Sequence, residues 1–104
     1  MIKLENTICR LTLKKEVVVN EIVLLEAAIN YTVFKLRNGK KIIASTTMKH
    51  FENVLPENTF LRINRSIIIN KKSIKKVNKN QLIMINDQVV FISRRRKKFV
   101  LTNL

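Results

Sequence analysis

Short apolar stretches separated by polar turns dominate this chain, and this pattern predicts an all-β domain. β-branched residues are frequent, and the stretches recur at intervals of about 8–12 residues. The predicted strands are Thr7–Leu13, Glu16–Val19, Ile22–Glu26, Tyr31–Leu36, Lys41–Ala44, Phe60–Ile63, Ser66–Ile69, Ile74–Asn78, Gln81–Ile85 and Gln88–Ile92. The pattern therefore indicates a mainly β fold.

Turn signals separate the predicted strands. Asn38-Gly39 is the clearest of them, because both residues tolerate the positive φ of a tight hairpin. Weaker signals are Lys14-Lys15, Lys79-Asn80 and Asn86-Asp87. One glycine and one proline in the whole chain argue against flexible linkers. We therefore predict a single domain over residues 1–104.

One segment has helical periodicity instead. Met48, Phe51 and Leu55 recur at i, i+3 and i+7, which is one face of a helix. A threonine at 46 or 47 can cap its start, and Pro56 ends it because the residue before a proline is driven out of the helical region. The sequence thus predicts one short helix near residues 46–55 that must pack on the sheet to be stable.

The segment FLRINRSIIIN, residues 60–70, combines a buried strand with a polar cluster. Three consecutive isoleucines, Ile67–Ile69, predict burial on both faces of a sheet. Just before them, Asn64, Arg65 and Ser66 supply an amide, a planar fork of donors and a hydroxyl. Such groups bind phosphates and read base edges. An ordinary strand with a solvated tip explains the segment equally well when it is taken alone.

Length and composition narrow the class of protein. The chain has 104 residues, 46% of them hydrophobic, which suits one domain with one core. No apolar run approaches the roughly 18 residues of a membrane span, and the N-terminus lacks the apolar core of a signal peptide. Cys9 is the only cysteine, so it forms no internal disulfide and best fits the core as a small apolar side chain. These features predict a cytoplasmic protein without a membrane partner.

The charge balance favours a polyanionic partner. Twenty-one Lys and Arg face seven Asp and Glu, a formal net charge of +14. Residues 53–104 carry twelve basic and two acidic side chains, so the second half is the more basic one. A chain this basic more often binds nucleic acid than membrane, although a soluble domain that happens to be basic remains the alternative.

The run SRRRKKF, residues 93–99, holds most of the clustered charge. Its five consecutive cations, Arg94, Arg95, Arg96, Lys97 and Lys98, can contact several phosphates, and an arginine can pair with guanine. The flanking apolar residues should fix the direction of the run, whereas a solvated basic turn is the alternative. Downstream, Phe99, Leu101 and Leu104 fit packing either as a short helix or as a closing strand.

Other polar positions are less specific. Asn30-Tyr31 offers an amide and a phenol between two predicted strands, but a turn asparagine followed by a strand tyrosine explains the pair better when it is taken alone. Lys71-Lys72 and Lys75-Lys76 fit phosphate contacts and solubilising charge equally well.

The sequence offers no catalytic constellation. His50 is the only histidine and has few acids near it, so it is predicted to be a surface residue of the short helix rather than a metal ligand or a base. There is no glycine-rich phosphate loop, no pair of catalytic carboxylates and no nucleophile elbow. We predict no enzyme activity, no cofactor and no metal.

Three ordered segments resemble the LytTR DNA-binding domain, the output module of many bacterial transcription regulators. EIVLLEAAINYTVFKLRNGK is similar to the opening strand, acidic residue, Asn-Tyr pair and hairpin of that family. TTMKHFENVLPENTFLRINRSIIIN is similar to its short helix and its Arg-Ser strand ending in asparagine, and IMINDQVVFISRRRKKF to its last hairpin and Ser-Arg signature. The resemblance spans about residues 21–99.

The resemblance implies an elongated, mostly antiparallel fold of about ten strands with a small helix. It also implies that the domain reads DNA with loops in successive major grooves. It implies contacts from Asn30 and Tyr31, from Asn64, Arg65 and Ser66, and from Arg94 and Arg95. It also implies direct repeats bound by two copies, whether or not the free protein dimerises. Histidine is frequent in the family where Asn64 stands, and glycine is common near position 29, where this chain has Ile29. The usual receiver domain is absent, which implies a standalone regulator or an output domain expressed alone.

The resulting hypothesis is a sequence-specific regulator of transcription that binds double-stranded DNA. In it, Arg65 and either Arg94 or Arg95 read bases, whereas Ser66, Arg96, Lys97, Lys98 and some of Lys71–Lys76 hold phosphates. The alternative is a structural RNA-binding or ribosome-associated protein, which the scarcity of aromatic residues disfavours. A protein that acts through other proteins or anionic lipid is the third and weakest alternative, because no amphipathic membrane helix is evident.

Overall fold

The computed structural model describes residues 8–10 and 16–104, with side chains from Val17 onward. The strands are β1 (Ile8–Arg10), β2 (Glu16–Val18), β3 (Ile22–Ala28), β4 (Tyr31–Leu36), β5 (Lys41–Ala44), β6 (Phe60–Asn64), β7 (Ile67–Asn70), β8 (Ile74–Val77), β9 (Gln81–Met84) and β10 (Val89–Phe91). The α-helices are α1 (Met48–Val54) and α2 (Lys97–Thr102), and single 3-10 turns occupy Val19–Glu21 and Lys71–Ser73. The predicted mainly β fold is confirmed.

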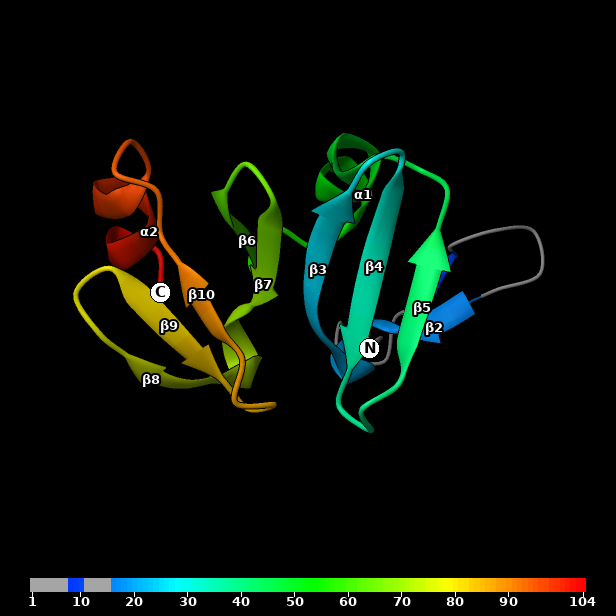
Figure 1. Cartoon of the computed structure of the whole chain (residues 1–104), viewed down its shortest axis with the longest axis horizontal. Helices are drawn as coiled ribbons and strands as arrows, with labels where there is room; N and C mark the ends of the chain where they lie inside the picture. The colour runs from blue at the N-terminus through cyan, green and yellow to red at the C-terminus, as the bar shows by residue number, and fades with distance from the viewer. Residues whose placement is uncertain (1–7, 11–15) are drawn as a thin grey trace.

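The ten strands of the described residues form three antiparallel sheets. The largest has the order β5-β4-β3-β7-β6, the second the order β10-β9-β8, and the third pairs β1 with β2. Strands β5 and β6 are therefore the edges of the central sheet. The Cα positions span 39 × 36 × 24 Å, and Figure 1 shows the second sheet and α2 beside the β6–β7 half of the central sheet.

The central sheet has a hydrophobic cluster on each face. Ile68 belongs to the cluster that includes residues of β3, β4 and α1, whereas Ile67 and Ile69 belong to the cluster with β9, β10 and α2. All three isoleucines are buried. The prediction that this run is covered on both faces is confirmed, because β7 lies inside the sheet and alternate side chains point to opposite faces.

Helix α1 packs on one face of the central sheet as its periodicity predicts. Met48, Phe51 and Leu55 are buried, and the Phe51 ring meets that of Phe34 edge-on with centroids 4.8 Å apart. Leu55 is extended, so the helix ends before Pro56 as expected. Thr47 occupies the capping position, but its side chain makes no capping hydrogen bond, so the predicted threonine cap is wrong in that respect.

The C-terminal tail forms helix α2, which is the first of the two alternatives that the sequence left open for it. Val100 is the residue of α2 that is buried, in the cluster with β9 and β10. Phe99, Leu101 and Leu104, which the sequence indicated as packing residues, are exposed. The helical repeat places Val100 on the face toward β6 and leaves its neighbours outside.

Three of the four predicted turns lie within the described residues, and all three are turns. Gly39 has φ of 86°, and the Asn38 side-chain oxygen accepts a hydrogen bond from the Lys40 backbone N–H. Asp87 has φ of 66°, and residues 78–80 connect β8 to β9. The predicted Lys14-Lys15 turn and the predicted strand ends at Thr7 and at 11–13 lie outside the described residues, as does the side chain of Cys9 on β1. Within the described ranges, neither helix is long and apolar enough to cross a membrane.

Candidate functional site

Three loops that are far apart in the sequence lie along one edge of the molecule. They are the β3–β4 turn, the β6–β7 turn and the loop from β10 to α2, all at the top of Figure 1. Two backbone hydrogen bonds connect them. The Ala27 N–H donates to the Ser66 carbonyl at 2.8 Å, and the Ser93 N–H donates to the Ile63 carbonyl at 3.1 Å. The fold thus brings all three predicted contact clusters to the same edge, which we call the loop edge.

The β6–β7 turn contains the central cluster, and its asparagine is fully engaged within the protein. The Asn64 amide donates through Nδ2 to the Phe91 carbonyl at 2.6 Å and accepts through Oδ1 from the Ser66 N–H at 2.7 Å. Arg65 and Ser66 are exposed at the tip. In the part of the chain that the structure describes, the Arg65 guanidinium has no hydrogen bond or ion pair. Arg65 therefore presents free donors, whereas Asn64 shapes the turn.

Arg62 supports the same turn from behind. Its guanidinium donates to Glu52 Oε1 on α1 at 2.9 Å, to the Asn64 carbonyl at 3.3 Å and to the Arg65 carbonyl at 2.6 Å. The side chain is 23% exposed. Sequence reasoning missed this role, because no periodicity links a helix residue with a strand residue ten positions later. The Arg62 guanidinium thus fixes the carbonyls of the turn that carries Arg65.

The β10–α2 loop contains the arginine run, and its three arginines differ in role. Arg96 donates from Nε to the Arg62 carbonyl at 2.7 Å, and its guanidinium carbon lies 4.9 Å from the centre of the Phe99 ring. The Arg96 N–H also donates to Ser93 Oγ at 3.2 Å. Arg94 and Arg95 are exposed. Arg96 thus anchors the loop to edge strand β6, and the other two extend from an anchored base.

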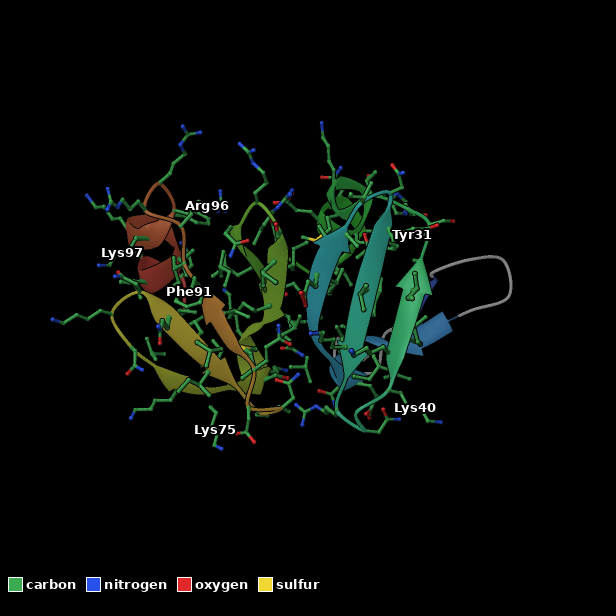
Figure 2. All side chains as sticks on the ribbon, in the orientation of Figure 1. Tyr31, Lys40, Lys75, Phe91, Arg96 and Lys97 are labelled. Atoms are coloured by element: carbon green, nitrogen blue, oxygen red, sulfur yellow. The ribbon has the colours of Figure 1, made fainter. Side chains whose placement is uncertain are left out.

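Lys97 and Lys98 begin helix α2. Lys97 is half-buried and Lys98 is exposed. Figure 2 labels Arg96 and Lys97 beside this helix, near the loop edge. The five predicted cations of the run therefore occupy one continuous corner of the molecule.

The β3–β4 turn forms the third part of the loop edge. Asn30 has φ of 66°, a conformation that asparagine tolerates better than most residues, and it closes the turn between β3 and β4. Tyr31 begins β4 and is 50% exposed, and Figure 2 shows it on the same edge as Arg96. Asn30 is a turn residue followed by the first residue of a strand, and the turn is also an exposed loop tip. The backbone therefore fits both interpretations of the pair.

A cleft of about 690 Å³ opens between the β6–β7 turn and the β10–α2 loop. Four arginines line it, together with the acid Glu52 and the ring of Phe99; the arginines are Arg62, Arg65, Arg95 and Arg96. Because one carboxylate faces four guanidinium groups, the cleft is electropositive and favours anions such as phosphate.

Two ion pairs lie away from the loop edge. Lys35 on β4 bonds Glu26 Oε1 on β3 at 2.9 Å and the Gln88 side-chain oxygen at 2.7 Å. The hydrogen bond from Lys35, followed by that from Gln88, lowers the pKa of the Glu26 carboxyl, and burial opposes this shift. Lys75 bonds Asp87 at 2.7 Å on the opposite edge, labelled in Figure 2. Both pairs neutralise lysine charge outside the loop edge, whereas Arg65, Arg94 and Arg95 stay exposed on it.

His50 lies on α1 as predicted. It is exposed, and its ring meets the Phe51 ring edge-on at 5.1 Å. Among residues 8–10 and 16–104, no group of three or more His, Cys, Asp and Glu side chains gathers as a metal site would.

Comparison with known proteins places this geometry in a family. The model of the LytTr DNA-binding domain matches residues 14–104. Four solved chains are similar. One is the LytTr DNA-binding domain of a Bacillus cereus protein described as a methyl-accepting/DNA response regulator, with 22% identity, a TM-score of 0.82, and coverage of 92% of this chain and 94% of that chain. No curated protein matches. Since the family model spans most of the sequence and the solved structure has the same fold, this protein belongs to the LytTr family of DNA-binding domains.

Proposed function

We propose that this protein regulates transcription by sequence-specific binding of double-stranded DNA through the loop edge. The observation that carries the proposal is the convergence of the three loops, with the exposed Arg65, Arg94 and Arg95 on turns whose backbones are fixed. Arginine pairs with the acceptors of guanine in the major groove, and rigid support lets it discriminate among bases.

The contacts divide into two kinds. Arg65 and either Arg94 or Arg95 read bases, because their side chains extend from the loop edge. Ser66, Arg96, Lys97 and Lys98 hold phosphates, with some of Lys71–Lys76 as further contacts. Asn30 and Tyr31 contact DNA from the third loop. Asn64 contributes by holding the turn in shape, since both ends of its amide are engaged.

In this proposal the loops lie in successive major grooves of one duplex. The three loops are arranged along the longest axis of the molecule (Figure 1). The whole molecule measures 39 Å along that axis, and one turn of B-DNA measures about 34 Å. We further propose that two copies bind direct repeats, as a homodimer on DNA or side by side, in a bacterial cytoplasm.

Selection of bound duplexes from a random pool tests the proposal. The expected result is one motif that recurs twice. If about six phosphates are neutralised, log affinity should fall with log salt at a slope of roughly −5. Replacement R65A should weaken binding by about 1–3 kcal/mol and flatten discrimination at one base pair, measured by fluorescence anisotropy.

Lys40→Ala is the matched control, since Lys40 is an exposed cation on the β4–β5 turn, at the end of the molecule opposite the loop edge (Figure 2). It should leave discrimination unchanged. If R65A binds cognate and random duplexes in the same ratio as the unmodified protein, the base-reading role of Arg65 is wrong. Competition between duplex DNA and structured RNA at fixed salt distinguishes the RNA-binding alternative, which predicts that RNA wins.

A further inference from the structure

Ile29 is the most exposed large apolar side chain of the described residues. It is 86% exposed, whereas the next value, that of Phe91, is 59%. It stands at the tip of the β3–β4 turn, on the loop edge, between Ala28 and Asn30. Exposure of an isoleucine to water gains nothing for folding, and at the tip its side chain is available for a contact outside the chain.

The end of this hairpin is narrow and rigid. Ala27 and Ala28, which precede the tip, are exposed and have small side chains. The Ala27 N–H is hydrogen-bonded to the Ser66 carbonyl at 2.8 Å, so the hairpin is fixed to the neighbouring turn just below its tip. The positive φ of Asn30 sets the turn beyond it. A two-stranded ribbon fits the major groove of B-DNA, and this one carries Ile29 at its leading end.

The chemistry of isoleucine limits what it can recognise there. Its side chain has no donor or acceptor, so it cannot pair with the polar edges of bases. The 5-methyl group of thymine is the apolar feature of the major groove, and apolar side chains contact it. We propose that Ile29 is a specificity-determining residue that contacts a thymine methyl group within the operator.

This inference rests on the proposed function and makes the β3–β4 turn a reader of A·T pairs. Arg65 and the arginines of the β10–α2 loop favour guanine by hydrogen bonding, whereas Ile29 adds a preference by apolar burial. The three loops then read different base pairs by different chemistry. Tyr31 and Asn30, beside it, stay available for polar contacts.

The experiment uses the duplex recovered by selection and replaces each thymine, one at a time, with deoxyuridine, which removes only the methyl group. Burial of one such group corresponds to about 0.8 kcal/mol, or about fourfold in affinity. We expect the unmodified protein to lose about fourfold at one position, and I29A to bind both duplexes equally. I29V should lie between them, which separates lost contact from lost folding.

Val77→Ala is the matched control, because Val77 is 48% exposed on β8, a strand of the other sheet. It should keep the full thymine preference. The inference is overturned if no thymine methyl matters, or if I29A keeps the same preference as the unmodified protein. Uniformly weaker binding of I29A to all duplexes would show a contact without base discrimination, which also overturns the inference. Absence of any duplex preference in the selection would instead contradict the proposed function.

Discussion

Replacing Asn64 with alanine should reduce stability rather than redirect base preference. The amide makes two short hydrogen bonds, to the Phe91 carbonyl and from the Ser66 N–H, and the residue is half-buried. Each such bond contributes about 0.5–1.5 kcal/mol net, so N64A should lower the free energy of unfolding by about 1–3 kcal/mol. The domain should stay folded, since small domains have about 5–15 kcal/mol of stability.

The effect on DNA binding follows from the same geometry. Without the amide, the β6–β7 turn loses its hydrogen bond to β10, and Arg65 keeps only the support that Arg62 gives to the carbonyls of the turn. Affinity for the selected duplex should fall, but no single base pair should show an altered preference. R65A should instead alter the preference at one base pair and leave stability nearly unchanged, because the Arg65 side chain is exposed and has no partner in the described part of the chain. Its stability should change by less than about 0.5 kcal/mol.

Urea unfolding followed by circular dichroism measures the first quantity, and anisotropy titrations on single-base variants of the duplex measure the second. The two replacements should give crossed results, with N64A changing stability and R65A changing discrimination. Unchanged unfolding of N64A together with altered preference at one base pair would refute the structural role of Asn64. It would return Asn64 to the group of base readers.

Three other replacements test the supports of the loop edge and the core. R62M removes three hydrogen bonds to Glu52 and the turn, so it should lower the free energy of unfolding by about 1–2 kcal/mol, measured with urea. R62K should lower it by only part of that amount. Because Lys35 lowers the pKa of Glu26 in the folded state, this carboxylate stabilises the fold at pH values above its ordinary pKa. The contribution is lost as the pH falls through the lowered pKa, so E26Q should flatten the acid limb of a stability–pH curve. An acid limb in E26Q that is identical to that of the unmodified protein would contradict the assignment. Ile68→Ala should cost about 2–5 kcal/mol, since the side chain is 1% exposed in the cluster that includes α1, and a loss below about 1 kcal/mol would contradict its placement there.

Much of the fold follows from local pattern. Strands β4 and β5 have the bounds that the sequence predicts, and the face of α1 is the one that its periodicity indicates. The isoleucine run is buried on both faces because three apolar residues in a row leave no solvent side in a strand. Local pattern left open whether the tail forms a helix or a strand, because the apolar residues after the charge run fit both, and Val100 is the residue of α2 that is buried.

The amino-acid sequence by itself determined which segments are strands, which residues fill the core and where the positive charge is concentrated, since side-chain period and composition fix these locally. The tertiary structure decided which polar side chains are engaged within the protein and which are exposed. Asn64 and Phe91 are 27 residues apart, and Arg96 and Arg62 are 34 apart, yet each pair is hydrogen-bonded. Such bonds form only when the second sheet and α2 pack beside the edge strand β6 of the central sheet, so no local pattern distinguishes an asparagine that shapes a turn from an arginine that is exposed.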